Sequence, residues 1–138
     1  MHDVFLDTDV ILDLFLHREP HHSVALHLFS SLKKRNMQGL TSPVAIANIY
    51  YILSKARNRR YAIEKIRRLR RLVRIAVIDE RIMDSAIRTP CKDFEDAIQY
   101  HCAVVNGADF LVTRNTADYP KNKLAVTSPV EYLRITAM

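Results

Sequence analysis

The sequence has few of the residues on which several classes of protein depend. Its two cysteines, Cys91 and Cys102, are too few for a disulfide framework and lack the spacing of a zinc site. Glycine occurs at only two positions, while hydrophobic residues make up 49% of the chain. This composition excludes a disulfide-stabilised or low-complexity protein and favours a compact, helix-rich one.

Long apolar stretches are also absent. No run of roughly 18 apolar residues occurs, and no basic stretch leads into an apolar one at the N-terminus. We therefore expect neither a membrane span nor a signal peptide, and a cytoplasmic protein that does not contact membranes. The 138 residues suit a single domain, residues 1–138, because a domain of this length buries roughly two thirds of its unfolded surface.

Positive charge is concentrated in one segment. Residues 55–74 contain ten lysines and arginines and a single acid, Glu64, which gives this segment a charge of +9. The whole chain carries +6, so the remainder carries −3. The chain is thus an acidic body with one basic helix, whose most outward residues are expected to be Arg67, Arg70, Arg71 and Arg74.

Apolar periodicity predicts strands and helices in alternation. Strands are expected at 4–6, 38–41, 73–78, 109–113 and 124–127. Helices are expected at 10–16 with Thr8 or Asp9 as the cap, at 23–34, after Ser42-Pro43, in the basic segment, at 80–88, at 93–106 and after Ser128-Pro129. Strands separated by helices predict an α/β fold of three layers, in which a central, mostly parallel sheet of about five strands is flanked by helices.

Candidate functional residues follow the strands. Asp7 comes directly after the strand at 4–6, and a polar segment, residues 113–118, follows the strand at 109–113. Ligands of parallel sheets collect at the carboxyl ends of the strands. We therefore expect these side chains to meet at one edge of the sheet.

The helix at 93–106 adds two more acids to this edge. Asp93, Asp96 and Tyr100 share one side of it by their spacings of three and four. Its opposite, buried side is expected to hold Phe94, Ala97, Ile98 and Cys102.

Carboxylates that converge from separate elements repel one another, and a bound Mg²⁺ or Mn²⁺ usually offsets that cost. Each acid also has a simpler interpretation. Asp7 or Asp9 can cap the helix at 10–16, Asp93 can cap the helix that follows it, and Asp118 can be a turn residue. Those interpretations do not account for several acids at the same edge.

Three motifs together resemble the PIN domain, a family of ribonucleases. The motifs are Phe5-Leu-Asp-Thr-Asp-Val-Ile-Leu-Asp13, Asp93-Phe-Glu-Asp-Ala-Ile-Gln99 and Ala108-Asp-Phe-Leu-Val-Thr-Arg-Asn-Thr-Ala-Asp-Tyr119. They occur in the family's order and span nearly the whole chain. The resemblance implies a metal-dependent ribonuclease fold, often the toxin half of a bacterial type II toxin-antitoxin pair.

The resemblance also assigns roles to individual residues. It makes Asp7 the first metal-binding acid and Asp96 the third, and it places the fourth within residues 115–118. Thr8 or Asp9 would orient the site, and Thr113 would support it.

The sequence departs from the family pattern at two positions. Asn48 stands where the family usually has a glutamate, and Asn115 stands where an aspartate is common, so the last carboxylate falls to Asp118. Asp93 and Asp9 are expected to compensate for the missing charge. We expect the site to hold one ion tightly, which is fewer than is usual for the family.

Phosphodiester hydrolysis is the chemistry that such a site predicts. A Mg²⁺ held by Asp7, Asp96 and Asp118 would lower the pKa of a bound water, which Asp118 or Asp93 would position. An acidic site repels a polyanion, so the basic helix would supply affinity for RNA. The resemblance also allows this surface to dock an acidic antitoxin segment, and it implies a homodimer.

Two other functions compete with this one. A catalytically inactive PIN-like module that binds RNA or a protein is favoured by Asn48 and Asn115. A phosphatase of the haloacid dehalogenase type is suggested by the Asp-X-Asp at Asp7, but that class needs a lysine and a larger cap that this chain does not convincingly supply.

Overall fold

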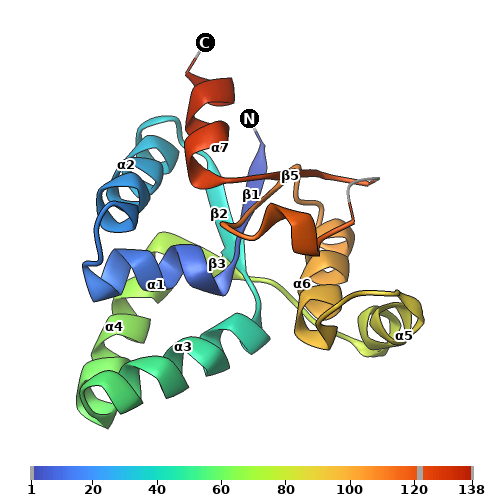
Figure 1. Cartoon of the computed structure of the whole chain (residues 1–138), viewed down its shortest axis with the longest axis horizontal. Helices are drawn as coiled ribbons and strands as arrows, with labels where there is room; N and C mark the ends of the chain where they lie inside the picture. Colours follow the sequence, from blue (N-terminus) through green and yellow to red (C-terminus); the bar gives the residue numbers. More distant parts are fainter. Residues whose placement is uncertain (1, 121–122, 138) are drawn as a thin grey trace.

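Figure 1 shows a sheet with helices on both sides, in a computed structural model that describes residues 2–120 and 123–137. The strands are β1 (Asp3–Leu6), β2 (Gln38–Thr41), β3 (Val73–Ile75), β4 (Phe110–Val112) and β5 (Ala125–Thr127). The α-helices are α1 (Thr8–Leu16), α2 (His21–Lys34), α3 (Pro43–Ala56), α4 (Arg59–Leu72), α5 (Glu80–Arg88), α6 (Phe94–Val105) and α7 (Pro129–Thr136). A short 3-10 helix, η1 (Thr116–Asp118), follows β4.

The sheet has five strands in the order β3-β2-β1-β4-β5, and every neighbouring pair is parallel. Strand β1 is central: Phe5 pairs with Leu40 of β2 on one side and with Leu111 of β4 on the other. The predicted three-layer α/β fold is confirmed. The residue that follows β1, Asp7, therefore leaves the sheet at the middle of its carboxyl edge.

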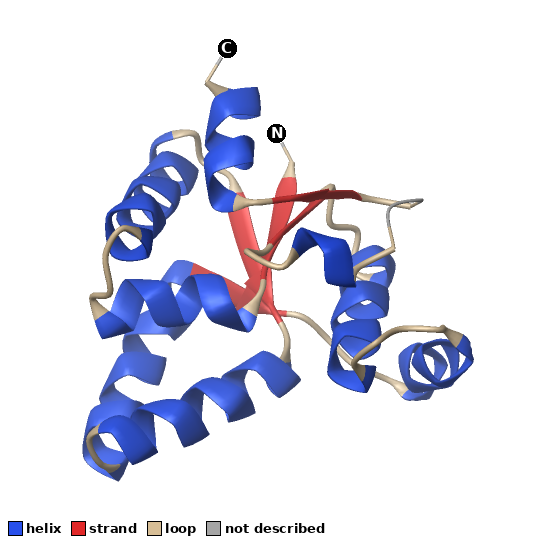
Figure 2. Ribbon diagram, in the orientation of Figure 1, coloured by secondary structure: helices blue, strands red, loops and turns tan. Residues whose placement is uncertain are grey.

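Helices cover both faces of the sheet (Figure 2), and a group of buried side chains on each face holds the layers together. Val4 and Leu6 of β1 point to the face covered by α1, α2, α3, α4 and α7. Phe5, which lies between them, points to the face covered by α5 and α6. This alternation follows from the two-residue period of a strand.

Most of the helices begin after a residue whose side chain accepts a hydrogen bond from the first helical turn. Ser42 accepts a hydrogen bond from the backbone N–H of Ala45, with Pro43 at the first helical position, and Asn58, Asp79 and Ser128 cap α4, α5 and α7 in the same way. Helix α6 ends at Val105 with Asn106 as its C-cap, and Gly107 follows with φ +80°, a conformation that favours glycine.

Three local predictions are wrong. Helix α1 begins at Thr8 and its cap is not Thr8 or Asp9 but Asp7, as the simpler interpretation of that acid predicts. Strand β3 ends at Ile75 rather than at 78, because the Asn106 side chain bonds both the N–H and the C=O of Val77 and so replaces a strand partner there. Phe94, predicted to be buried, is 50% exposed at the first position of α6.

No helix within the described residues is long and apolar enough to cross a membrane.

Candidate active site

Asp7 is the centre of the candidate site. It follows β1 directly, and only 7% of its surface is exposed. Oδ1 accepts a hydrogen bond of 2.7 Å from the backbone N–H of Thr8, which makes Asp7 the cap of α1. Oδ2 accepts hydrogen bonds of 2.8 Å from the Thr113 hydroxyl and 2.8 Å from the Tyr119 hydroxyl. The carboxylate is therefore oriented from three different segments of the chain.

The structure brings Asp96 to the same place from another helix. Asp96 lies in the first turn of α6, and its Oδ1 is 3.2 Å from the Tyr119 hydroxyl that also bonds Asp7. The predicted meeting of Asp7 and Asp96 at the carboxyl edge of the sheet is thus present. Tyr119 itself was not predicted to be part of the site, although it ends the third family motif.

Asp93 and Asp118 lie near Asp96 without touching Asp7. Asp93 caps α6 by accepting a hydrogen bond of 2.9 Å from the backbone N–H of Glu95, as its simpler interpretation predicts. Burial, followed by repulsion from Asp7, Asp93 and Asp118, raises the pKa of Asp96 to about 6, although the Tyr119 hydrogen bond opposes the rise. The site therefore concentrates negative charge around Asp96.

Asp9 is crowded against Asp7 from the first turn of α1. Its Oδ2 accepts hydrogen bonds of 3.0 Å from the backbone N–H of Arg114 and 3.2 Å from the Asn115 side chain. Its Oδ1 is buried and has no hydrogen-bond partner among the described residues. Burial, with repulsion from Asp7 second, raises the pKa of Asp9 to about 6.

Thr113, which the family resemblance makes a supporting residue, and Asn115, a departure from the family pattern, both contact the acids. The Thr113 hydroxyl lies 2.8 Å from Asp7 and 3.4 Å from Asp9, and it accepts a hydrogen bond of 3.1 Å from the backbone N–H of Asn115. Because Asn115 bonds Asp9 through its side chain, it supports a carboxylate where an aspartate would repel one.

Two further polar residues belong to the site: Gln99, which was not predicted, and Ser42, which follows β2 at the same edge of the sheet. Gln99 is fully buried in α6 and donates a hydrogen bond of 3.5 Å to Oδ1 of Asp7. The Ser42 hydroxyl donates a hydrogen bond to the other end of the Gln99 amide. Gln99 thus links the start of α3 to Asp7, and its spacing of three from Asp96 could have indicated this position.

Asn48 contacts an acid that was also not predicted. Its side-chain amide donates a hydrogen bond to Glu95, the residue before Asp96. The position where the family usually carries a glutamate on α3 is therefore next to a glutamate supplied by α6. Glu95, rather than Asp93, is the acid that faces Asn48.

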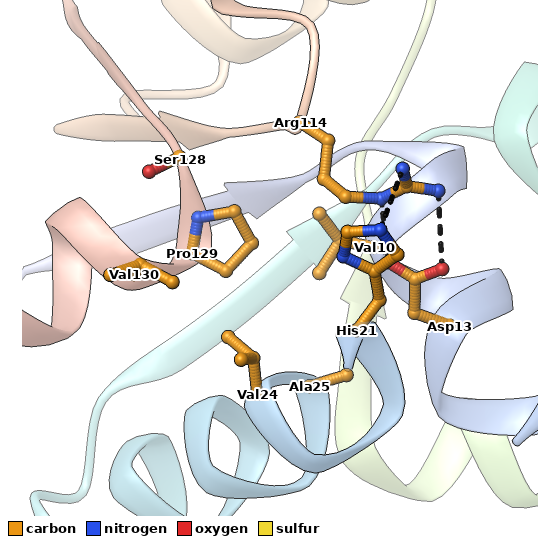
Figure 3. Close-up of a pocket in the computed structure, with 9 residues that line it drawn as sticks. All are labelled: Val10, Asp13, His21, Val24, Ala25, Arg114, Ser128, Pro129 and Val130. Atoms are coloured by element: carbon orange, nitrogen blue, oxygen red, sulfur yellow. Dashed lines mark hydrogen bonds and ion pairs between the residues drawn. The ribbon is translucent and has the colours of Figure 1, made fainter. Parts of the chain in front are cut away.

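The side chain of Arg114, whose backbone contacts Asp9, forms an ion pair with another acid, Asp13. Figure 3 shows Arg114 turned toward the buried Asp13, with its Nε 2.8 Å from Oδ2 and its Nη2 3.2 Å from Oδ1. The pair borders a cavity of about 280 Å³ between α1, α2 and the start of α7, which is otherwise lined mainly by apolar side chains. The Arg114 guanidinium is therefore engaged with Asp13, while its backbone N–H serves Asp9.

The predicted RNA-binding arginines lie apart from the acids. Arg67, Arg70, Arg71 and Arg74 are exposed, and none of them forms an ion pair with a described residue. Helix α4 ends at Leu72, and the next residue, Val73, is in register with Gly39 of β2 and through it with Val4 of β1. The last turn of α4 is therefore level with the beginning of β1, toward the end of the sheet opposite Asp7.

The side chains at the carboxyl edge suit a hard divalent cation in their chemistry. Asp7, Asp9 and Asp96 offer only oxygen atoms, and one of these, Oδ1 of Asp9, is buried without a partner. In residues 2–120 and 123–137, however, no group of three or more His, Cys, Asp or Glu side chains is arranged to hold a metal ion. A third carboxylate from Asp93 or Asp118 was expected to join Asp7 and Asp96, and it does not.

Comparison with known proteins finds a relative by sequence. The chain is 27% identical over 121 residues to ribonuclease VapC1 of Aquifex aeolicus (strain VF5), an alignment that covers 84% of this chain and 83% of that protein.

Solved structures share the fold at lower identity. VapBC2 from Rickettsia felis, bound to a DNA fragment from its promoter, matches with a TM-score of 0.70 and 15% identity over 90% of this chain and 96% of that one. VapBC-1 from nontypeable Haemophilus influenzae gives a TM-score of 0.70 and 16% identity over 93% and 98%. Mycobacterium tuberculosis VapC20, a Sarcin-Ricin loop cleaving toxin, gives 0.65 and 19% over 78% and 86%.

The family itself is identified by its sequence profile. The PIN domain profile matches residues 3–117, which include β1, the acidic start of α6 and the polar segment after β4. This chain belongs to the PIN domain family.

Proposed function

We propose that this chain is a metal-dependent endoribonuclease that hydrolyses phosphodiester bonds in RNA and is the toxin of a toxin-antitoxin pair. The observation that carries the proposal is the convergence of Asp7 and Asp96 on one hydroxyl at the carboxyl edge of the sheet. The likeness to ribonuclease VapC1 supports RNA as the substrate. The likeness to two VapBC structures supports the role of toxin in a toxin-antitoxin pair.

Asp7 and Asp96 are the proposed metal ligands. A bound Mg²⁺ or Mn²⁺ would lower the pKa of a water molecule and offset charge on the departing oxygen. Hydrogen bonds from Thr113 and from Gln99 of α6 orient the Asp7 carboxylate. Asp93 or Asp118 then positions the attacking water. Glu95, on the same turn of α6, supplies the charge that Asn48 lacks.

Affinity for RNA is assigned to α4 and to Arg74 of β3. The exposed side chains of Arg67, Arg70, Arg71 and Arg74 have no acidic partner among the described residues, so their charges are available to phosphates. These cations lie toward the opposite end of the sheet from Asp7. An RNA bound by both must therefore extend along the side of the molecule, which favours a structured or long substrate over a dinucleotide.

A groove between α1, α2 and α4 is the proposed docking site for the antitoxin. It is a cavity of about 550 Å³ with an apolar floor that includes Phe15, Phe29 and Leu72. Lys33, Lys65 and Arg68 also line it, and no acid is among its lining residues. Leu72 is 46% exposed. An amphipathic segment with acidic residues at its edges matches this surface in both apolar contact and charge.

An inactive PIN-like module that binds RNA or protein is the second candidate. It is favoured by Asn48 and Asn115, which each replace an acid by a neutral amide, and by the lack of a third converging carboxylate within the described ranges. Both amides hydrogen-bond a neighbouring carboxylate, however, which keeps acids at the edge.

The Asp96→Asn variant tests the choice between the two. The substitution removes one charge from the proposed metal site with little change in size, so RNA cleavage in Mn²⁺ should fall by about a hundredfold or more. Cleavage of a labelled structured RNA is measured with Mn²⁺ and with EDTA. The control is Asp84→Asn, which removes an exposed acid of α5 and should leave the rate unchanged. Cleavage that persists in Asp96→Asn, or that does not depend on the metal, contradicts the proposal.

A further inference from the structure

Tyr119 occupies an unusual position for a tyrosine. It follows η1 directly, and only 4% of its surface is exposed. Its hydroxyl lies 2.8 Å from Oδ2 of Asp7 and 3.2 Å from Oδ1 of Asp96. One phenolic hydrogen thus faces two carboxylate oxygens that come from different layers of the fold.

A divalent cation shared by Asp7 and Asp96 would take oxygen ligands from the same two carboxylates. Mg²⁺ binds carboxylate oxygens at roughly 2.0–2.1 Å, so an ion shared by Asp7 and Asp96 must lie between their carboxylates. The Tyr119 hydroxyl lies there, within hydrogen-bond distance of both. An ion that binds the two oxygens to which Tyr119 is hydrogen-bonded would displace this hydroxyl.

The two carboxylates depend on Tyr119 to different degrees. Without the Tyr119 hydroxyl, Asp7 would still accept hydrogen bonds from Thr8 and Thr113. The Asp96 side chain, by contrast, has one hydrogen-bond partner among the described residues, the Tyr119 hydroxyl. Loss of the hydroxyl would therefore free the Asp96 carboxylate while leaving Asp7 oriented.

We propose that the Tyr119 hydroxyl and the divalent cation are alternative partners of Asp7 and Asp96, so that Tyr119 sets the metal concentration at which the site forms. This inference rests on the proposed function. It makes Tyr119 a positioning residue that weakens metal binding, whereas a purely structural tyrosine would either strengthen the site or leave its affinity unchanged.

The Tyr119→Phe variant separates these roles. Isothermal titration with Mn²⁺ is carried out on the wild type, on Tyr119→Phe and on Tyr132→Phe. Tyr132 is a matched control because it is also fully buried, but its hydroxyl contacts His2 and Met37 at the other end of β1. We expect Tyr119→Phe to bind Mn²⁺ about tenfold more tightly than the wild type, which corresponds to one competing hydrogen bond. We expect the Tyr132→Phe affinity to equal that of the wild type.

Thermal unfolding in EDTA provides a second measurement on the same proteins. Tyr119→Phe should unfold at a lower temperature than the wild type in EDTA and should gain more from added Mn²⁺. Mn²⁺ affinity of Tyr119→Phe that is equal to or weaker than that of the wild type overturns the proposal.

The wild type alone gives an independent test that does not require the variant to fold. Ultraviolet resonance Raman bands of tyrosine report the hydrogen bonding of the phenol, and they should change when Mn²⁺ saturates the site. Bands that stay constant through a titration that shows binding overturn the proposal. If neither the wild type nor Tyr119→Phe binds Mn²⁺, the metal site of the proposed function fails together with this inference. If only Tyr119→Phe binds, the competition is supported.

Discussion

Asp9 is a carboxylate whose ionisation opposes folding. Burial and the charge of Asp7 raise its pKa from 3.8 to about 6, so the folded chain holds this proton more tightly than the unfolded chain does. The stabilisation from proton binding is complete below pH 3.8 and is lost as the pH rises through 6. A shift of this size corresponds to about 3 kcal/mol of unfolding free energy.

The Asp9→Asn variant should therefore gain stability relative to the wild type as the pH rises from about 4 to about 7. The asparagine carries no charge at any of these values, whereas Asp9 becomes ionised. The measurement is urea unfolding of both proteins in EDTA at several pH values. Asp84→Asn, on an exposed part of α5, should show no such gain. A difference between Asp9→Asn and the wild type that does not vary with pH would contradict the assignment.

The contact between Asn48 and Glu95 leads to a second prediction at the scale of residues. Asn48→Glu would place a carboxylate against Glu95, so the variant should be less stable than the wild type by about 1–2 kcal/mol in EDTA and should bind Mg²⁺ more tightly. Thermal unfolding and calorimetric titration measure the two effects. The double variant Asn48→Glu/Glu95→Gln keeps one acid in the pair and should recover stability. Mg²⁺ affinity that is unchanged or lower in Asn48→Glu would show that this position is outside the metal site.

Helix α4 carries the prediction at the scale of elements. Replacing Arg67, Arg70 and Arg71 by alanine should weaken RNA binding and make its salt dependence shallower by roughly one unit per lost phosphate contact. Binding is measured in the Asp96→Asn background at several salt concentrations, so that RNA stays intact.

The matched control for α4 removes three arginines elsewhere, Arg81, Arg88 and Arg134, which are exposed on α5 and α7. It changes the net charge by the same amount. If both triple variants lose the same affinity, binding follows overall charge and not the surface of α4.

Elements were predictable where a local signal marks them. Ser42-Pro43 and Asn106-Gly107 mark a helix start and a helix end within a few residues, and both predictions are confirmed. The end of β3 was not predictable, because it depends on the Asn106 side chain, which is distant in sequence and takes over the backbone of Val77. The exposure of Phe94 likewise depends on which neighbours the fold provides at the start of α6.

The candidate site shows the same limit. The meeting of Asp7 and Asp96 follows from strand order and helix position, which periodicity indicates. Contacts made by Gln99, Glu95 and Tyr119 depend on the direction of side chains across layers, and no spacing within one element specifies that. Sequence thus predicted which elements carry the site, while the hydrogen bonds inside it required the structure.

The groove between α1, α2 and α4 carries the prediction at the scale of the whole molecule. Leu72→Glu places a charge on its apolar floor and should weaken the complex with a co-expressed antitoxin at least about tenfold, while RNA cleavage by the free chain is retained. Co-purification and calorimetry measure the complex. The control is Ile87→Glu, which charges an exposed apolar residue of α5 outside the groove. An antitoxin that binds Leu72→Glu and the wild type equally well docks on a different surface.

The position of β1 at the middle of the sheet has a consequence for synthesis of the chain. Strands β1, β2 and β3 all come from the first 75 residues and lie side by side, whereas β4 and β5 join the other edge of β1. Asp7 is therefore translated before Asp96, Thr113 and Tyr119, which emerge roughly 5 to 20 seconds later. If the chain has the proposed nuclease activity, a nascent chain that cut RNA would be a hazard to the message that encodes it. The acids cannot assemble until residues 96–119 have been made.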